Sequence, residues 1–258
     1  MEVWEALVLG LLQGLTEFLP VSSSGHLVIA QRLMGINSGD VTFEVMVHAA
    51  TVLATITVFW NEIAVLMKGG LKFKYNAETR YLLKIGISMI PVLIVGLFFK
   101  DFVRGIFSET IGFVGCMLLV TAALLALTHF LRPGKTHPVS YRDAFAIGLV
   151  QAAAVIPGIS RSGSTIATGL LLGGDRDQVA KFSFLMVLVP ILGEAFLEII
   201  DTPVSLLDNG LPLLVGFIAA YVSGLFACRV MIRIVSRGKL YWFAIYCAAA
   251  GITAIMLN

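Results

Sequence analysis

Charged residues are scarce in this sequence: Asp, Glu, Lys and Arg make up 13% of its 258 residues, while hydrophobic residues make up 58%. About a quarter of a soluble globular domain is charged, so this composition argues against a soluble enzyme. Lys and Arg number 18 against 16 Asp and Glu, a near balance that excludes the basic surface of a nucleic-acid-binding protein. The three cysteines stand alone in apolar sequence, which argues against a disulfide framework or a cysteine metal centre. A basic region before the first apolar run is also lacking, so we expect no cleaved signal segment.

Long apolar runs take the place of charge, and the mean hydropathy is +0.94. A helix needs roughly 17 to 25 apolar residues to cross about 30 Å of hydrocarbon. The sequence therefore predicts an all-α polytopic membrane protein with a single membrane domain over residues 1–258. Its six transmembrane helices are predicted at Phe43–Trp60, Leu82–Phe99, Ile111–Leu131, Phe182–Ile200, Leu211–Ile232 and Leu240–Leu257.

Two further hydrophobic segments are interrupted by hydroxyls, glycine and an ionisable side chain. In the first segment Val3–Leu19 is followed by Pro20–His26 and then by the shorter apolar run Leu27–Gly35. In the second segment Ala144–Ile156 is followed by Pro157–Ser164 and then by Thr165–Gly173. Backbone without helical hydrogen bonds is tolerated at membrane depth only where protein buries it or a wet cavity solvates it. We therefore expect each break to lie inside the protein.

The two broken segments are copies of each other. A shift of 138 positions without gaps matches Gly10 with Gly148, Gln13 with Gln151, Ser22 with Ser160 and Gly25 with Gly163. Three predicted spans separate the copies, and an odd number of crossings reverses their orientation. The sequence therefore predicts two inverted repeats, residues 1–131 and 142–258.

The distribution of Lys and Arg indicates how the broken segments meet the membrane. If both segments cross, the two sides of the membrane carry eight and nine of these residues, leaving out Arg161. If both dip in and return, the sides carry fourteen and three. The positive-inside rule favours two re-entrant helical hairpins, with the basic side in the cytoplasm. We expect a multi-pass protein of the plasma membrane with both termini outside and with the two hairpin tips meeting near the midplane.

The composition of the two tips suits an anion. A tight break that precedes a helix aims backbone N–H groups and the positive helix end at one point. Ser23 and His26 are three residues apart and would share one helix face, while Arg161 is a costly cation at membrane depth unless it is paired or binds an anion. The alternative is that the serines only cap helices and that Arg161 pairs with a glutamate. The other residues of the tips that we expect to contact the anion are Ser22, Ser24, Gly25, Ser160, Ser162, Gly163 and Thr165.

Glu17 lies about two turns before Ser23 and shares a helix face with Gln13. A carboxylate at that depth needs a partner, which is either a hard cation such as Mg²⁺ or Ca²⁺, with Gln13 as a second oxygen ligand, or Arg161. Glu44 and His48 are also four apart, and a structural hydrogen bond between them is favoured over a role beside the site. Glu194 is a weak site candidate, Glu198 is expected at the membrane interface, and His129 and His137 are assigned no role.

Two motifs carry a resemblance to a known family. The stretch from Gln13 to His26, QGLTEFLPVSSSGH, and the stretch from Pro157 to Thr165, PGISRSGST, resemble the two signatures of the bacitracin-resistance type of undecaprenyl-diphosphate phosphatase. The resemblance implies a membrane enzyme that releases the terminal phosphate of a C55 polyprenyl diphosphate, regenerates the lipid carrier of cell-wall synthesis, depends on a divalent cation and opens to the outer face. It also implies that Glu17, Ser23, His26 and Arg161 are the functional residues. Gln13 stands where many relatives have glutamate, which leaves one carboxylate fewer for a metal.

Three alternatives remain open at the level of sequence. Ser23 attacks phosphorus with His26 as the base, which we favour, or His26 attacks and forms a phosphohistidine. The inverted repeats also fit a secondary transporter or a flippase of polyprenyl phosphates, which would move substrate without releasing phosphate. A membrane scaffold without a site would leave Glu17, His26 and Arg161 unexplained. The oligomeric state is not predicted.

Overall fold

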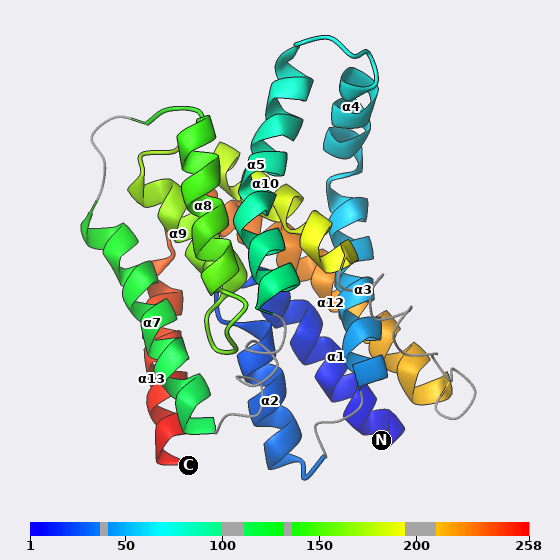
Figure 1. The fold of residues 1–258 in the computed structure, drawn as a ribbon. Helices are drawn as coiled ribbons and strands as arrows, with labels where there is room; N and C mark the ends of the chain where they lie inside the picture. Colours follow the sequence, from blue (N-terminus) through cyan, green and yellow to red (C-terminus); the bar gives the residue numbers. More distant parts are fainter. Residues whose placement is uncertain (37–40, 100–110, 132–135, 194–209, 258) are drawn as a thin grey trace.

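The computed structural model describes residues 1–36, 41–99, 111–131, 136–193 and 210–257. Within these ranges the chain is helical and has no strand, only an isolated bridge between His137 and Gly174. The predicted all-α class is therefore confirmed. The helices, drawn in Figure 1, are α1 (Val3–Phe18), α2 (Ser23–Leu33), α3 (Val41–Val58), α4 (Trp60–Gly70), α5 (Ala77–Phe98), α7 (Ile111–Phe130), α8 (Tyr141–Ala153), α9 (Arg161–Leu171), α10 (Arg176–Met186), α12 (Gly210–Ser236) and α13 (Tyr241–Met256).

Three helices in the described part of the chain, α5, α7 and α12, are long and apolar enough to cross a membrane. Helices α3 and α4 provide a fourth crossing if they are taken together, although they are bent by 77° at the break between them. Helix α13 is apolar but has only 16 residues. Large apolar side chains are exposed along these helices, as expected where lipid replaces water as the solvent; Leu97 in α5 and Phe226 in α12 are 74% and 63% exposed.

The predicted span Phe182–Ile200 differs most from the structure. Helix α10 begins earlier, at Arg176, and ends at Met186. Pro190 follows four residues later and has no N–H to donate to the carbonyl of Met186, so an uninterrupted helix would lack a hydrogen bond there. After a turn at Val187 the chain is helical again over residues 188–193. Residues 194–200 of the predicted span, which include Glu194 and Glu198, lie outside the described residues.

The two broken segments recur in the structure with the same shift of 138 positions. The first residues of α2 and α9 differ by 138, and so do the last residues. A serine caps the start of each helix, because the hydroxyl of Ser22 or Ser160 accepts a hydrogen bond from the backbone N–H three residues later. A glycine with positive φ follows the end of each helix, Gly35 at 69° and Gly173 at 89°. The sequence repeat is therefore also a repeat of local structure.

The two helical hairpins approach each other from opposite ends of the molecule. In Figure 1, α1 and α2 occupy the lower half, whereas α8 and α9 occupy the upper half, and the breaks lie between them. The Ser162 hydroxyl donates a hydrogen bond of 3.2 Å to the carbonyl of Leu19, so the two breaks are in contact. The prediction that the hairpin tips meet is confirmed. The start of α1 and the end of α13 lie at the same end of the molecule.

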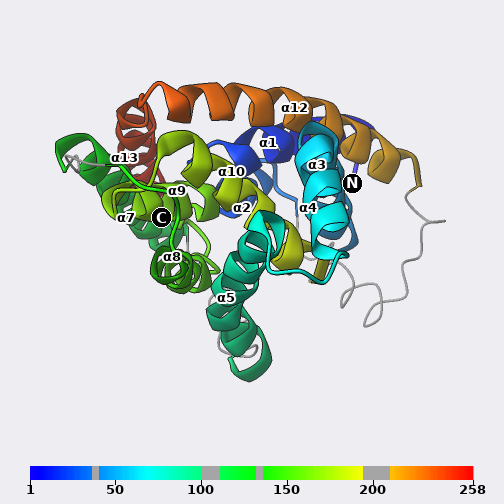
Figure 2. The ribbon, with the colours of Figure 1, turned by 90° about the horizontal axis from the view of Figure 1, so that it is seen from above.

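Each hairpin is held by a long helix of the other half of the chain. Helix α1 packs on α12 and helix α8 packs on α5, as Figures 1 and 2 both show. A Cβ atom at Gly14 would lie 2.3 Å from the carbonyl oxygen of Ala220, and one at Gly148 would lie 2.3 Å from that of Ser88. Only glycine permits this close approach of two helix backbones. The breaks are thereby fixed in the interior, beside a core that includes Phe18, Phe59 and Phe184.

Candidate active site at the two hairpin tips

The break between α1 and α2 is a tight turn that begins a helix with free N–H groups. Ser22 has a φ of 68°, in the left-handed region that non-glycine residues rarely adopt, and its hydroxyl accepts a hydrogen bond from the Gly25 N–H. Such strained residues persist where the surroundings fix them, and they concentrate at functional sites. The turn places Ser23 at the first position of α2, where the positive end of the helix dipole favours an anion. The expectation of a helix that begins near Ser22 is confirmed.

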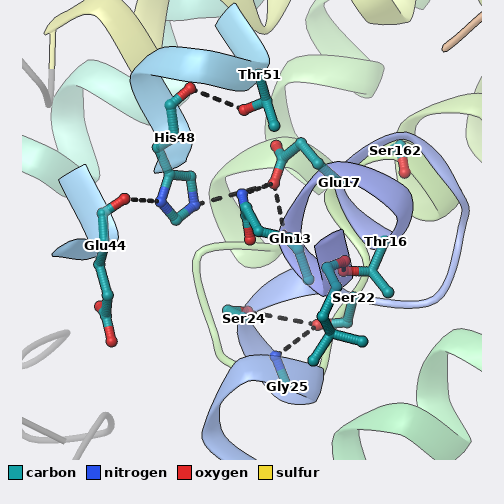
Figure 3. Close-up of polar contacts among 12 residues, drawn as sticks. Gln13, Thr16, Glu17, Ser22, Ser24, Gly25, Glu44, His48, Thr51 and Ser162 are labelled. Atoms are coloured by element: carbon teal, nitrogen blue, oxygen red, sulfur yellow. Dashed lines mark hydrogen bonds and ion pairs between the residues drawn. The ribbon is translucent and has the colours of Figure 1, made fainter. Parts of the chain in front are cut away.

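The Glu17 carboxylate is the centre of a polar cluster on the first hairpin (Figure 3). Its Oε2 atom accepts a hydrogen bond of 2.6 Å from the Ser23 hydroxyl and one of 3.0 Å from the side-chain amide of Gln13. The Nε2 atom of His48, on α3, lies 3.9 Å from the same oxygen. The side chain of Glu17 is only 8% exposed, so this carboxylate is desolvated and depends on these partners.

His26 is turned toward a different helix. Its Nε2 atom lies 2.7 Å from the hydroxyl of Tyr246 on α13, and its ring stacks on the Tyr246 ring with the planes 12° apart. Its Nδ1 atom lies 2.9 Å from the carbonyl oxygen of Ser22, which can only accept, so Nδ1 carries the hydrogen. Both ring nitrogens therefore have partners other than Ser23. Ser23 and His26 lie three residues apart on α2, as expected, but the Ser23 hydroxyl is bonded to Glu17 and not to the imidazole.

The second tip repeats the capping pattern and is held by α7. The Ser160 hydroxyl accepts a hydrogen bond from the Gly163 N–H and lies 3.4 Å from the Ser162 hydroxyl. The Ser22 hydroxyl makes the same two contacts in the first tip, with the Gly25 N–H and the Ser24 hydroxyl. The hydroxyl of Thr121 on α7 accepts from the Ser160 N–H at 2.9 Å and donates to the Gly158 carbonyl at 3.1 Å. These bonds satisfy backbone groups that the break leaves without helical partners.

Arg161 begins α9 and faces the first hairpin across a cavity. Both hairpins line this cavity, with Glu17 and Phe18 from the first and Arg161, Ser162 and Thr165 from the second. No other described residue gives the Arg161 guanidinium a hydrogen bond or an ion pair, and Arg161 and Glu17 attract each other electrostatically without forming an ion pair. The alternative of a direct Arg161–Glu17 pair is thus absent from this structure. The cavity is lined by Glu17, Phe18, Thr51, Thr55, Arg161, Ser162, Thr165, Ser183, Phe184, Val187 and Ile191.

The remaining candidates from the sequence are placed as follows. Thr165 bonds the Ser183 hydroxyl at 2.5 Å on the cavity wall, and Ser24 lies against Ser22 in the first tip. The structural hydrogen bond expected between Glu44 and His48 is present, and it runs from the His48 Nδ1 atom to the backbone carbonyl of Glu44 at 2.8 Å. The Glu44 carboxylate accepts from Gln31 on α2. His137 lies on the surface, and the carbonyls of Pro138 and Leu172 raise the pKa of its imidazole.

Two side chains at the tips were not identified from the sequence. Tyr246 forms a hydrogen bond with His26 and stacks on its ring, and Thr121 forms hydrogen bonds with the backbone of the second break. Both lie within long apolar runs, where a hydroxyl needs a hydrogen-bond partner. That need was the signal available in the sequence, but periodicity alone cannot identify a partner that is 220 residues away in the chain.

The oxygen atoms beside Glu17 are of the kind that a hard divalent cation binds. Gln13 is 0% exposed, and its buried Oε1 atom has no hydrogen-bond partner. The amide nitrogen of Gln13, and not this oxygen, faces Glu17, at 3.0 Å from its Oε2 atom. A half-turn of the amide would bring the oxygen there, where a cation shared with the carboxylate would satisfy it. The described part of the chain holds no group of three or more His, Cys, Asp or Glu side chains around one point. After the half-turn of its amide, Gln13 would offer a cation a second oxygen donor beside the Glu17 carboxylate.

Comparison with known proteins places the chain in a family. Residues 6–253 match the family described as Bacitracin resistance protein BacA. An undecaprenyl-diphosphatase of Bacteroides fragilis is 54% identical over an alignment of 263 positions, which covers 100% of this chain and 99% of the relative. The undecaprenyl-diphosphatases of Parabacteroides distasonis and Halothermothrix orenii are 54% and 40% identical, over 99% and 100% of this chain and 98% of each relative. These matches run through both hairpin motifs and nearly the whole sequence. The chain belongs to the bacitracin resistance protein BacA family.

Proposed function

We infer that this protein hydrolyses undecaprenyl diphosphate to undecaprenyl phosphate and orthophosphate, which recycles the lipid carrier of cell-wall synthesis and confers resistance to bacitracin. The observation that carries this function is the full-length similarity to undecaprenyl-diphosphatases. The geometry of the hairpin tips supports it, because the Arg161 guanidinium and the buried Glu17 carboxylate line one cavity, and the Ser23 hydroxyl is bonded to that carboxylate. The roles of individual residues follow from that geometry and are part of this proposal.

Arg161 is proposed to hold the diphosphate. Its guanidinium has five donors in a planar fork, which matches the oxygens of a phosphate group. It lines the cavity opposite Glu17 and has no competing acceptor within the described residues. The N–H groups at the starts of α2 and α9 add partial positive charge from both sides. The polar headgroup would thus be bound between the hairpins while the prenyl tail stays in the lipid.

Ser23 is proposed as the nucleophile, with Glu17 in place of His26 as the group that accepts its proton. The 2.6 Å bond already directs the Ser23 hydrogen toward the carboxylate. Attack by Ser23 Oγ on the terminal phosphorus forms a phosphoserine and breaks the bond to the bridging oxygen, which leaves on undecaprenyl phosphate. Water then cleaves the phosphoserine to orthophosphate. The alternative, attack by His26, requires Tyr246 to leave the Nε2 atom first.

A divalent cation, Mg²⁺ or Ca²⁺, is proposed to be held by Glu17 and Gln13. Such an ion supplies positive charge beside the phosphate oxygens when it is bound. The buried, unpartnered oxygen of Gln13 and the carboxylate beside it support this assignment. Glu17 keeps its bond to Ser23, so one side chain both orients the nucleophile and contributes charge to the cation site.

We propose six membrane crossings and two re-entrant hairpins, arranged as the inverted repeats 1–131 and 142–258 in the plasma membrane. The approach of the hairpins from opposite ends and the position of the described termini at one end support this arrangement (Figure 1). The bias of Lys and Arg toward one side supports termini and a site opening on the outer face. Membrane-impermeant thiol labelling of cysteines placed at Glu2 and at Lys72, at the α4–α5 turn, tests it. Labelling of both from the same side would refute the arrangement.

The test of function is phosphate release by the purified full chain in detergent. With undecaprenyl or farnesyl diphosphate as the substrate, orthophosphate should appear, should stop after chelation and should resume when Mg²⁺ or Ca²⁺ is added back. Quenched turnover followed by mass spectrometry then identifies the nucleophile, because phosphoserine survives acid and phosphohistidine does not. Absence of phosphate release with either cation would overturn the proposed function, and an acid-labile adduct on His26 would overturn the role of Ser23.

A further inference from the structure

His48 lies at the Glu17 cluster and has no role in the reaction as described above. It comes from α3, outside both hairpins, and its Nε2 atom faces Glu17 Oε2 at 3.9 Å (Figure 3). Its side chain is 22% exposed. No signature motif of the sequence includes this residue, and only the packing of α3 against α1 and α12 brings it to the site.

The tautomer of His48 is fixed by its own helix. Its Nδ1 atom lies 2.8 Å from the backbone carbonyl of Glu44, and a carbonyl can only accept a hydrogen bond. Nδ1 therefore carries a hydrogen, and a neutral His48 presents the lone pair of Nε2 to the Glu17 carboxylate. A lone pair that faces a carboxylate is repelled unless a positive charge, either a proton or a metal ion, lies between them. Metal-binding histidines in proteins are oriented by the same kind of bond from the distal ring nitrogen to a carbonyl.

We propose that His48 is a nitrogen ligand of the cation held by Glu17 and Gln13, and that it shifts the preference of this site from Mg²⁺ and Ca²⁺ toward Mn²⁺ and similar transition metals. The inference rests on the cation of the proposed function and identifies a third ligand for it. An imidazole nitrogen suits transition metals, whereas sites made only of oxygen suit Mg²⁺ and Ca²⁺.

The distances agree with a shared ion. Ligand atoms lie about 2.0 to 2.2 Å from a small divalent ion, so two of its ligands are at most about 4.4 Å apart, and neighbouring ligands are about 3 Å apart. The separation of 3.9 Å between His48 Nε2 and Glu17 Oε2 is within that limit. The amide nitrogen of Gln13 lies 3.0 Å from the same oxygen, and rotation of the amide by half a turn exchanges it for the unpartnered Oε1. Donors from Gln13 on α1 and from His48 on α3 therefore both lie within 3.9 Å of the Glu17 Oε2 atom.

The test is Mn²⁺ binding by the full chain in detergent, stripped of metal and without substrate. Electron paramagnetic resonance gives the affinity, and electron spin echo modulation detects a directly bound nitrogen. The wild type should show one ¹⁴N-coupled Mn²⁺. His48→Gln should lose the nitrogen signal and weaken Mn²⁺ binding at least about tenfold, with a smaller change in the affinity for Mg²⁺ measured by competition. His26→Gln, which removes the other histidine of the hairpin tip, should keep the nitrogen signal.

The repeat supplies a matched control for Gln13. Gln151 occupies the corresponding position of the second hairpin, and its buried amide also lacks hydrogen-bond partners. Gln151→Leu removes an amide whose two polar atoms are both unsatisfied, and Gln13→Leu removes one unsatisfied oxygen and one of the two hydrogen bonds to Glu17, which keeps the bond from Ser23. Both variants should therefore fold. Gln13→Leu should weaken Mn²⁺ binding, and Gln151→Leu should not.

Each outcome decides the proposal. A nitrogen signal that survives in His48→Gln, a signal lost only in His26→Gln, or no Mn²⁺ binding by the folded wild type would overturn it. Phosphate release is measured separately on the same preparations. Hydrolysis without a His48-dependent nitrogen signal would refute the ligand but leave the proposed function intact. The His48-dependent nitrogen signal without hydrolysis would support His48 as a ligand but refute the proposed function.

Discussion

Replacement of Arg161 by alanine is the sharpest test of the proposed site. The guanidinium is held at the start of α9, lines the cavity and is not bound to any acceptor in the described part of the chain. It therefore has no acceptor to give up when the diphosphate binds, and its removal takes away positive charge where negative charge develops. The loss of one preorganised donor of this kind typically costs 10² to 10³ in kcat, about 3 to 4 kcal/mol.

Arg161→Lys should recover only part of that loss, because an ammonium keeps the charge but not the two-pronged geometry. Arg32→Ala removes an exposed arginine from α2 and is the matched control, for which turnover should stay near the wild-type value. Orthophosphate release from undecaprenyl diphosphate in detergent gives kcat and KM for all three variants, with the melting temperature of each as the check on folding. A folded Arg161→Ala protein with wild-type turnover would refute the reasoning.

Three further predictions concern positioning and stability. Tyr246→Phe removes the bond to the His26 ring but keeps the stacked ring; because Glu17 and not His26 accepts the Ser23 proton in the proposed mechanism, kcat should fall by less than about tenfold, and a larger loss would assign His26 a part in the reaction. Gly14→Val inserts a side chain against the backbone of α12 and should lower the stability in detergent by about 1 to 3 kcal/mol, whereas Gly86→Ala, where nothing lies within 4 Å, should not. The raised pKa of His137 means that its protonated form is favoured in the folded state. Its stabilisation should be full below about pH 6.5 and should disappear as the pH rises through the raised value, and His137→Ala should remove that part of the pH dependence of Tm.

The sequence predicted the local structure of the tips well because that structure is encoded locally. A serine followed three residues later by a glycine N–H donor is a capping signal, and it recurs at the same spacing in both copies. The repeat itself predicted that two hairpins would meet, and the bond from Ser162 to Leu19 joins them. The anion-binding character of the tips also follows from short motifs, since a helix start and a cation need no distant partner.

The parts that failed, or were not foreseen, depend on contacts between distant segments. The sequence placed His26 beside Ser23 by helical spacing, but the competing hydroxyl of Tyr246 determines where the imidazole points. It paired His48 with Glu44, because both lie on one helix face, and could not show that Glu17 lies 3.9 Å from the other ring nitrogen of His48. The bend between α3 and α4 likewise has no proline or glycine at the break that would have indicated it.

The divergence of the two copies accounts for a site that a symmetric repeat could not form. Under the shift of 138 positions, Glu17 corresponds to Val155, Ser23 to Arg161 and His26 to Ser164. Two identical first tips would bring two carboxylates together around a diphosphate, and the like charges would repel it. Two identical second tips would attract the diphosphate but would provide no carboxylate to activate a hydroxyl. Both copies have the capping serine, but only the first has the carboxylate and the nucleophilic serine, and only the second has the arginine. The shared backbone therefore forms one anion site, with Ser23 on one side and the Arg161 guanidinium on the other.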